Sequence, residues 1–291
     1  MDKLMITNLR IFWIAISLLL MPNLANAVGV SFLAPGWTAS DFHTLDTPTR
    51  AIEFDSLGNI YIEDTTNDNS GVIEILKFDA SSGYSTSSIF TSYITTYKGV
   101  TGLDFDDQGS LYVSERSRDG DTGIIREVDV ATQMLVGDVM AFANHRPTGV
   151  DADASGNVYY SGRKDSDLIW GKIFEIDSTL TRTELSANTV ATGIALDAMG
   201  NIFISTPNRT DLPLANNSIY KFDSGDFSSP VLIASFDQRG GELTFDDIGN
   251  LYFVAEDQVS IVKLSAIPVP AAIWLFVSGL IGLTSVARRK A

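Results

Sequence analysis

The sequence predicts an all-β fold, a five-bladed antiparallel β-propeller, and three observations support this prediction. Five segments of the chain are near-copies of one another, beginning at Glu53, Asp104, Asp151, Ala195 and Thr244. Each contains an Asp-x-x-Gly turn between two short apolar stretches. The turn glycines, Gly58, Gly109, Gly156, Gly200 and Gly249, lie 51, 47, 44 and 49 residues apart. Repeats of this length built from short strands are typical of propeller blades.

Each copy also contains the strands that a blade needs. The turn joins two strands as a hairpin, because Gly tolerates positive φ and an Asp side chain can accept hydrogen bonds from nearby backbone amides. A third strand follows at 73–79, 124–129, 172–177, 219–223 and 259–264. A weaker fourth strand is predicted at 88–93, 134–142, 181–185 and 231–236.

The last copy lacks a fourth strand, which bears on how the ring closes. Residues 28–267 hold five repeats at the observed spacing. A sixth blade is the alternative, but the stretch before the first copy is long enough for one strand and too short for four. We therefore expect a strand within 28–44 to pair with 261–264 and complete the last blade.

The first 27 residues predict a signal peptide. Lys3 and Arg10 flank the start of an apolar run, 11–21, which is too short to span a bilayer. Ala25 and Ala27 form an Ala-x-Ala site for signal peptidase, so we expect the exported domain, 28–267, to begin at Val28. A retained N-terminal anchor or a buried helix is the alternative interpretation.

The other end predicts a transmembrane helix. Residues 271–287 carry no charge and are followed by Arg288, Arg289 and Lys290. Basic residues stay on the cytoplasmic side of a membrane, so we expect the propeller on the outer side of the inner membrane. The alternative, a helix packed in a soluble core, would need a polar face, and this segment has none.

Residues 268–291 resemble the PEP-CTERM sorting signal. The resemblance rests on Pro268 and Pro270, an Ala-Ala-x-Trp opening with Trp274, a Ser-Gly-Leu-x-Gly-Leu stretch with Gly279, and the terminal Arg288, Arg289 and Lys290. Val269 stands where the motif has Glu. The resemblance implies a Gram-negative surface or matrix protein, held transiently in the inner membrane until an exosortase removes the tail.

The repeats themselves resemble NHL-type and gluconolactonase-type propellers over nearly the whole exported region. This implies the fold, which by itself does not specify an activity. The complete chain has 36 acidic and 20 basic residues and no Cys, and removing both terminal segments leaves 35 acidic and 15 basic residues. The absence of Cys excludes a disulfide framework, and the acidity argues against a nucleic-acid partner.

Alignment of the five inner strands on their shared Asp reveals a set of acidic residues. Glu53, Asp104 and Asp151 lie two residues before that Asp, and Glu242 lies four residues before it in the last copy. Carboxylates gathered around a central channel could bind a divalent cation such as calcium, or they could line a water-filled channel without binding a metal. Gluconolactonase-type enzymes place a metal-binding Glu near the start of an inner strand, but Glu242 lacks the Glu-Gly-Pro context of that site.

A second candidate site is basic and lies in the variable connections on the face opposite the Asp-x-x-Gly turns. Guanidinium groups there could bind an anionic sugar or another carboxylate, and an indole could stack on a sugar ring. Each of these residues could instead be an ordinary surface residue paired with an acid. The candidates are Arg50, Arg116, His145, Arg146, Arg163, Trp170 and Arg239.

These features lead to functions of two classes. We expect an exported, non-enzymatic binding or interaction module that recognises exopolysaccharide or other surface proteins. The alternative is a metal-dependent lactonase or hydrolase at the mouth of the channel. Carboxylate and amide oxygens gathered around one point would favour the enzyme.

Overall fold

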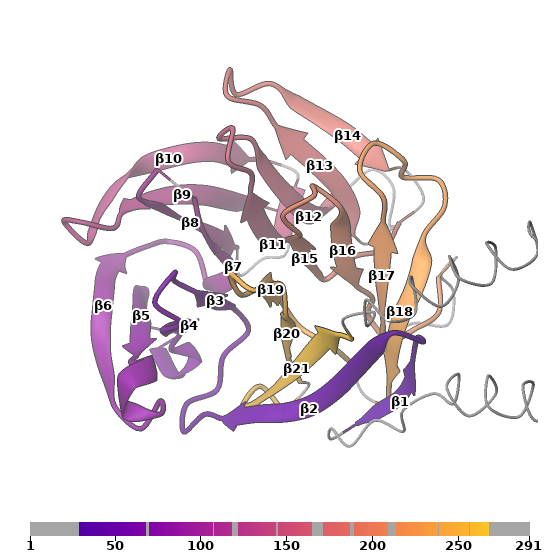
Figure 1. The fold of residues 1–291 in the computed structure, drawn as a ribbon. Helices are drawn as coiled ribbons and strands as arrows, with labels where there is room; N and C mark the ends of the chain where they lie inside the picture. Colours follow the sequence, from indigo (N-terminus) through magenta and orange to yellow (C-terminus); the bar gives the residue numbers. More distant parts are fainter. Residues whose placement is uncertain are drawn as a thin grey trace, which may run out of the picture.

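Five antiparallel sheets are arranged as the blades of a ring (Figure 1). The computed structural model describes residues 29–67, 70–106, 108–117, 122–143, 145–164, 171–186, 189–208, 214–237, 239–255 and 257–267. The predicted five-bladed propeller is confirmed, and the six-bladed alternative is wrong.

Blades 1 to 3 each use four consecutive strands. Blade 1 contains β3 (Ile52–Phe54), β4 (Ile60–Glu63), β5 (Val72–Phe78) and β6 (Ser87–Ile94), with short 3₁₀ turns η1 (Thr65–Asn67) and η2 (Ala80–Ser82). Blade 2 contains β7 (Gly99–Phe105), β8 (Ser110–Arg116), β9 (Gly123–Asp129) and β10 (Met134–Phe142). Blade 3 contains β11 (His145–Ala152), β12 (Val158–Lys164), β13 (Lys172–Ile176) and β14 (Arg182–Ser186).

Blades 4 and 5 combine strands from both ends of the described chain. Blade 4 contains β15 (Gly193–Leu196), β16 (Ile202–Ser205), β17 (Ser218–Phe222), β18 (Val231–Phe236) and the additional strand β1 (Val30–Leu33). Blade 5 contains β19 (Leu243–Phe245), β20 (Leu251–Val254), β21 (Ser260–Ala266) and β2 (Trp37–Thr44).

The ring closes through β2, which lies beside β21 in Figure 1 although the two strands come from opposite ends of the domain. Trp37 is opposite Ala266, and Thr44 is opposite Ser260. The prediction of a closing strand within 28–44 is therefore confirmed. The strand nearest Val28 is β1, however, and it extends blade 4 by pairing with β18, which the sequence did not lead us to expect.

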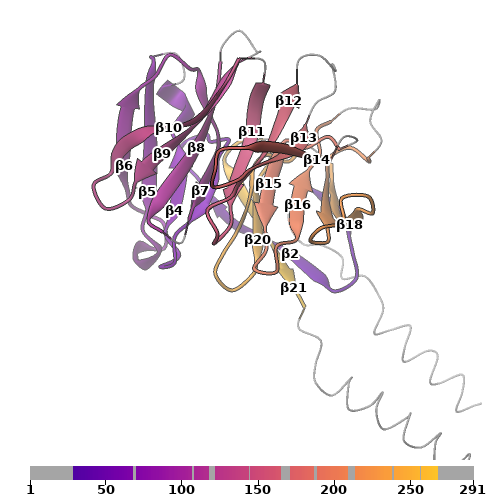
Figure 2. The same ribbon diagram turned by 90° about the horizontal axis from the view of Figure 1, so that it is seen from above.

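The Asp-x-x-Gly turns lie together on one face, which we call the bottom face; the opposite face is the top face (Figure 2). Their glycines have φ between 74° and 98°, a region open to glycine and strained for other residues. In blade 5, Asp246 Oδ1 accepts hydrogen bonds from the backbone N–H of Ile248 (3.2 Å) and Asn250 (2.8 Å). Asp246 Oδ2 accepts from Asn250 Nδ2 (2.6 Å) and the Tyr252 hydroxyl (2.9 Å). These turns are therefore structural joints, as the repeat predicted.

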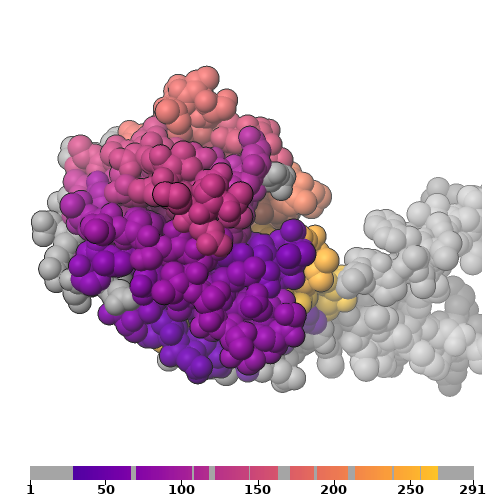
Figure 3. All heavy atoms as spheres, turned by 90° about the vertical axis from the view of Figure 1, so that its left-hand side faces the viewer, coloured from indigo at the N-terminus to yellow at the C-terminus, as the bar shows by residue number. Residues whose placement is uncertain are grey.

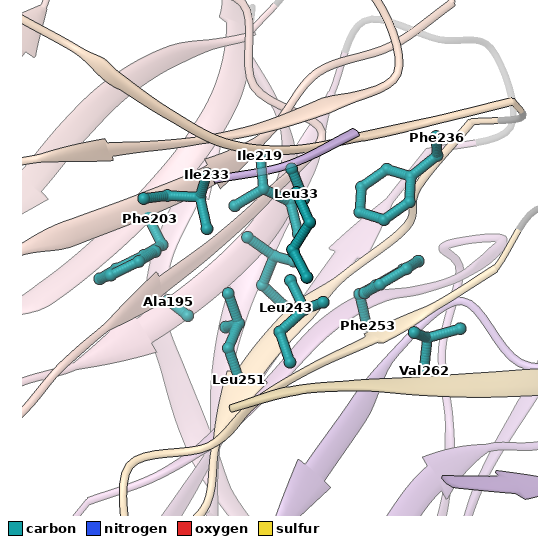
Figure 4. Packing of buried hydrophobic residues seen from close by; sticks show 12 residues of the cluster. Leu33, Ala195, Phe203, Ile219, Ile233, Phe236, Leu243, Leu251, Phe253 and Val262 are labelled. Atoms are coloured by element: carbon teal, nitrogen blue, oxygen red, sulfur yellow. The ribbon is translucent and has the colours of Figure 1, made fainter. Parts of the chain in front are cut away.

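The hydrophobic core lies between neighbouring blades. Figure 4 shows the cluster between blades 4 and 5, to which Phe203, Leu243 and Phe253 belong together with Leu33 of β1. On the side of the ring seen in Figure 3, the spheres of blades 1 and 2 make up most of the surface. Successive side chains of a strand point to opposite faces of the sheet, so each blade directs one set of apolar side chains toward each neighbouring blade. Contacts with both neighbours therefore stabilise every blade.

Both predicted terminal segments lie outside the described residues, with Ala25 and Ala27 at one end and Pro268, Pro270, Trp274, Gly279, Arg288, Arg289 and Lys290 at the other. Within the part of the chain that the structure describes, no helix is long and apolar enough to cross a membrane.

Candidate functional site

A polar cavity of about 420 Å³ opens at the top mouth of the central channel. Four arginines line it, contributed by four of the five blades: Arg50, Arg116, Arg146 and Arg239. Among the residues that the structure describes, the polar lining also includes threonines at the tops of the inner strands, Gln258 and one acidic residue, Glu242. We call this cavity the arginine pocket.

The arginines reach the pocket from the ends of inner and second strands. Arg116 is the last residue of β8 and Arg146 the second residue of β11, whereas Arg50 and Arg239 precede β3 and β19. Arg50 Nη1 lies 4.0 Å from the buried Glu63 Oε2, an ion pair that supports the guanidinium from below. Among the lining residues that the structure describes, four are cationic and one is acidic, although the whole chain carries a formal charge of −16.

The threonines hold the blades together around the mouth. Thr101 Oγ1 donates to the carbonyl oxygen of Pro147 in blade 3 (3.0 Å), and Thr148 Oγ1 donates to that of Ala191 beside blade 4 (3.3 Å). Thr192 Oγ1 lies 2.9 Å from Ser205 Oγ in its own blade. Each hydroxyl oxygen can still accept a hydrogen bond, so these threonines both connect strands around the channel mouth and give the pocket a polar surface.

Glu242 projects from blade 5 toward the inner strands of blades 2 and 3. Its Oε1 accepts a hydrogen bond from the Val150 backbone N–H (3.3 Å), and Oε2 has no hydrogen-bond partner among the described residues. Glycine is required beside it, because a Cβ at Gly149 would lie 2.8 Å from Oε2 and one at Gly102 would lie 3.0 Å from Oε1. Burial, and secondarily the charges of Asp151 and Glu53, raises the pKa of Glu242 well above its usual range. Burial therefore favours the protonated form of this side chain.

The three acids of the other column are also buried, and they link adjacent blades. Asp104 Oδ2 accepts from the Ala152 N–H of blade 3 (2.7 Å), and Asp151 Oδ2 accepts from the Leu196 N–H of blade 4 (2.8 Å). Glu53 accepts from the Thr244 hydroxyl of blade 5 (2.6 Å) and from the N–H of its neighbour Phe54 (2.8 Å).

Burial also governs the protonation of these three acids. It raises the pKa of Asp151 to about 8. It raises the pKa values of Asp104 and Glu53 well above the usual range, and the nearby charge of Asp151 adds to both effects. Burial thus favours the protonated form of each acid, and carboxyl groups in that form can lie close together without a counter-ion.

The residues present do not fit the divalent cation that a gluconolactonase-type site implies. In the described ranges, no three His, Asp or Glu side chains are placed to hold one ion together. The oxygens of Glu53, Asp104 and Asp151 are instead directed at backbone amides and hydroxyls of the neighbouring blades. We therefore derive no chemistry through a metal at this position.

The basic candidates predicted from sequence separate into two groups. Arg50, Arg116, Arg146 and Arg239 are brought together in the arginine pocket. His145 does not line it: the side chain is buried between Phe142 and Phe174, and its Nδ1 lies 3.1 Å from Arg182 Nη1. The prediction for His145 is wrong because β11 already begins at this residue, and neighbours in a strand point to opposite faces. The Arg163 side chain and Trp170 lie outside what the structure describes.

The threonines of the pocket were missed in the sequence, although a signal for them exists. A Thr-Gly pair recurs at Thr101, Thr148 and Thr192, directly before the apolar part of the inner strand. Blade 1 has Arg50-Ala51 at this place and blade 5 has Gly241-Glu242. The two departures from the Thr-Gly pair thus place a guanidinium and a carboxyl group at the mouth of the channel.

Comparison with known proteins supports the fold. No protein-family model and no curated protein matches the chain in sequence. A gluconolactonase from Xanthomonas campestris has a similar structure, with a TM-score of 0.52 and 13% identity over 82% of this chain and 97% of that one. A carbohydrate-active enzyme of family AA12 from Trichoderma reesei gives a TM-score of 0.51 and 14% identity over 84% and 100%. At these identities the likeness establishes that the chain shares the β-propeller fold of these proteins.

Proposed function

We propose that this protein is an exported propeller that binds a carboxylate-bearing carbohydrate in the arginine pocket. The observation that carries the proposal is the convergence of four guanidinium groups from four blades on one polar cavity. Guanidinium groups bind carboxylates through paired hydrogen bonds, and they cannot lose their charge at any physiological pH.

The other lining residues suit a sugar acid. A cavity of about 420 Å³ lies within the usual range for small-molecule sites. The threonine hydroxyls and the carboxylic acid of Glu242 can exchange hydrogen bonds with sugar hydroxyls, while the arginines hold the acid group. Burial favours the protonated form of Glu242, and in that form the carboxyl group can donate a hydrogen bond to an anionic ligand.

The predicted export and sorting signals supply a biological setting. A propeller released outside the inner membrane meets surface polysaccharides, many of which contain uronic acids. We infer an anionic exopolysaccharide, or a fragment of one, as the partner. A long polyanion would be repelled by the acidic remainder of the domain, so we expect a terminal or internal sugar acid to enter the pocket by itself.

Titration calorimetry with glucuronate and galacturonate tests this proposal, with glucose and galactose as neutral analogues. We expect the uronates to bind, the neutral sugars not to bind, and affinity to fall as salt rises. Arg146→Gln and Arg239→Gln should each weaken binding. Arg182→Gln removes an arginine of the outer strand β14 and should leave binding unchanged. Equal binding of glucose and glucuronate, or equal losses in all three variants, would overturn the proposal.

A second candidate is an enzyme acting on a sugar lactone, favoured by the unpartnered Oε2 of Glu242 and by the two sugar-related enzymes that share the fold. In this reaction water adds to the lactone carbonyl carbon and the bond to the ring oxygen breaks. Glu242 gives its proton to that oxygen and regains one from the attacking water.

Aldonolactone hydrolysis followed in a pH-stat separates the two candidates. For the enzyme we expect turnover that Glu242→Gln abolishes while uronate binding persists. Wild-type hydrolysis no faster than the uncatalysed rate would eliminate the enzyme and leave the binding module.

A further inference from the structure

We propose that the bottom of blades 4, 5 and 1 forms a lipid-facing surface that rests on the bilayer into which the C-terminal segment inserts. We call this surface the apolar sector and define it by the turn tips Leu57, Met199 and Ile248. The inference concerns the face opposite the arginine pocket and does not depend on what that pocket binds. It does rest on the predicted transmembrane helix at 271–287.

The first observation is the exposure of the turn tips. The third residue of each Asp-x-x-Gly turn is exposed, and in three blades it is a large apolar residue. Leu57 is 78% exposed, Met199 75% and Ile248 85%. In blades 2 and 3 the same position holds Gln108 and Ser155. Blades 4, 5 and 1 are consecutive around the ring, so the three apolar tips lie on adjacent blades.

The second observation is a charge difference that follows the same division. One position near the bottom end of the third strand carries a lysine in these three blades. It is Lys77 in blade 1, Lys221 in blade 4 and Lys263 in blade 5, and each lies opposite the recurring aromatic residue of the second strand. Blades 2 and 3 carry Glu127 and Glu175 there.

These lysines offset acids of the bottom face. Lys77 Nζ lies 3.9 Å from both Asp55 and Asp79, and Lys221 Nζ lies 2.9 Å from Asp223. Blades 2 and 3 have a carboxylate where these lysines stand, so their bottom side carries more negative charge. Because biological membranes are negatively charged or neutral, the apolar sector is the part of this acidic domain that can approach one.

The third observation is where the chain leaves the propeller. β21 ends on the bottom face in blade 5, the middle blade of the apolar sector, and Ser265 Oγ donates to Asn250 Oδ1 of the turn that carries Ile248 (2.6 Å). Three residues separate Ile267 from the predicted helix at Ala271. They span at most about 11 Å, which is comparable to the depth of a lipid headgroup layer.

This tether selects the lipid surface over other occupants. A helix that begins four residue steps from Ile267, at most about 14 Å away, holds the turn of blade 5 close to the headgroups at a high effective concentration. Exposed Leu, Ile and Met side chains are stabilised when they enter the boundary between headgroups and acyl chains. In this arrangement the arginine pocket faces away from the membrane.

The absence of Cys makes the proposal directly testable, because each Cys variant carries one thiol. The full-length chain is reconstituted into phosphatidylcholine vesicles with a polarity-sensitive fluorophore on Leu57→Cys, Met199→Cys or Ile248→Cys. Ile94→Cys reports on the top face, where the native side chain is 84% exposed, and Gln108→Cys and Ser155→Cys report on the bottom of blades 2 and 3. We expect blue-shifted emission and quenching by lipids with brominated acyl chains at positions 57, 199 and 248. We expect neither effect at 94 and smaller effects at 108 and 155.

The alternatives give different results. Failure of the chain to co-sediment with vesicles, or equal emission at 248 and 94, would overturn the proposal. Shielding of position 248 that persists in detergent and disappears on dilution would also overturn it, since that outcome identifies a second copy as the occupant. Lys77→Glu, Lys221→Glu and Lys263→Glu together give the sector the charge of blades 2 and 3. In vesicles containing phosphatidylglycerol, this triple variant should lose most of the emission shift at 248.

Discussion

The top and bottom faces of this propeller are built from the same repeat, but different positions of the repeat vary on the two faces. On the bottom face, the Asp and the Gly of the turn are kept in all five blades, and the two residues between them vary. On the top face, the Thr-Gly pair is kept in three blades and replaced in two, by Arg50-Ala51 and by Gly241-Glu242.

The difference shows how a repeated fold acquires a site. Turn hydrogen bonds are needed in every blade to fix the register of the inner hairpin, so their residues cannot change independently. The channel mouth is shared by all blades, and a side chain from one of them reaches the space in front of the others. One or two departures from the repeat therefore suffice to change the chemistry of the top face.

The largest effect is expected from breaking a bottom turn. Asp246→Ala removes four accepted hydrogen bonds and leaves the Tyr252 hydroxyl and two backbone amides without this partner. We expect a loss of about 3 kcal/mol in the free energy of unfolding, measured by urea denaturation. Asp247→Ala, in the exposed next position, is the control and should be close to neutral. Similar small losses in both variants would show that the turns are not the structural joints of the ring.

The channel between the two faces should make stability depend on pH. Between the ordinary pKa of Asp, about 4, and the native pKa of Asp151, about 8, the folded protein binds a proton that the unfolded chain lacks. Stability contributed by this site is therefore present at acidic pH and is lost as pH rises toward 8.

Asp151→Asn keeps an acceptor for the Leu196 N–H and removes the ionisation. We expect it to raise the free energy of unfolding at pH 8 by roughly 2 kcal/mol, and to flatten the dependence on pH. Melting temperatures of wild type and variant at pH 5 and pH 8 measure the effect. A wild-type protein that is equally stable at both values would contradict the protonated state that we assign to the channel.

A smaller effect is expected at the arginine pocket, and on binding instead of stability. Arg146→Gln removes one charge-assisted contact from the ligand and should weaken uronate binding by about tenfold, or about 1.4 kcal/mol. Its free energy of unfolding should stay within about 0.5 kcal/mol of wild type. A variant that binds normally but unfolds easily would show that Arg146 supports the blade and not the ligand.

The smallest effect on the soluble domain is expected at the turn tips. Leu57→Ser and Ile248→Ser change exposed side chains that make no described contact with the core, so stability should change by less than about 0.5 kcal/mol. Uronate binding should not change at all. A large loss of stability would mean that the tips pack on the protein, and would remove the contrast between the two faces.

Local sequence patterns predicted most of the fold. The spacing of the glycines predicted the number of blades, and alternation of apolar residues predicted nearly every strand. The incomplete last copy predicted the closing strand, because a blade short of one strand must obtain it from elsewhere. β1 was not predicted, since it adds to a blade that already has four strands and leaves no gap in the repeat.

The site could be predicted only in part. The candidate arginines were found by their place at the tops of the blades, but His145 was grouped with Arg146 because both were taken as loop residues. Once β11 extends to His145, the pleat places the imidazole in the core and leaves the guanidinium at the pocket.

The repeat, the turn chemistry and the acidic character of the domain follow from residues close together in the chain, so they can be predicted without a structure. Which distant residues share one space depends on how the five blades pack around the channel. Closure of the ring brings Arg50, Arg116, Arg146 and Arg239 to one cavity, and it directs Glu242 across the axis to Gly102 and Gly149. Residues from four different blades meet only when all five inner strands point toward a common channel.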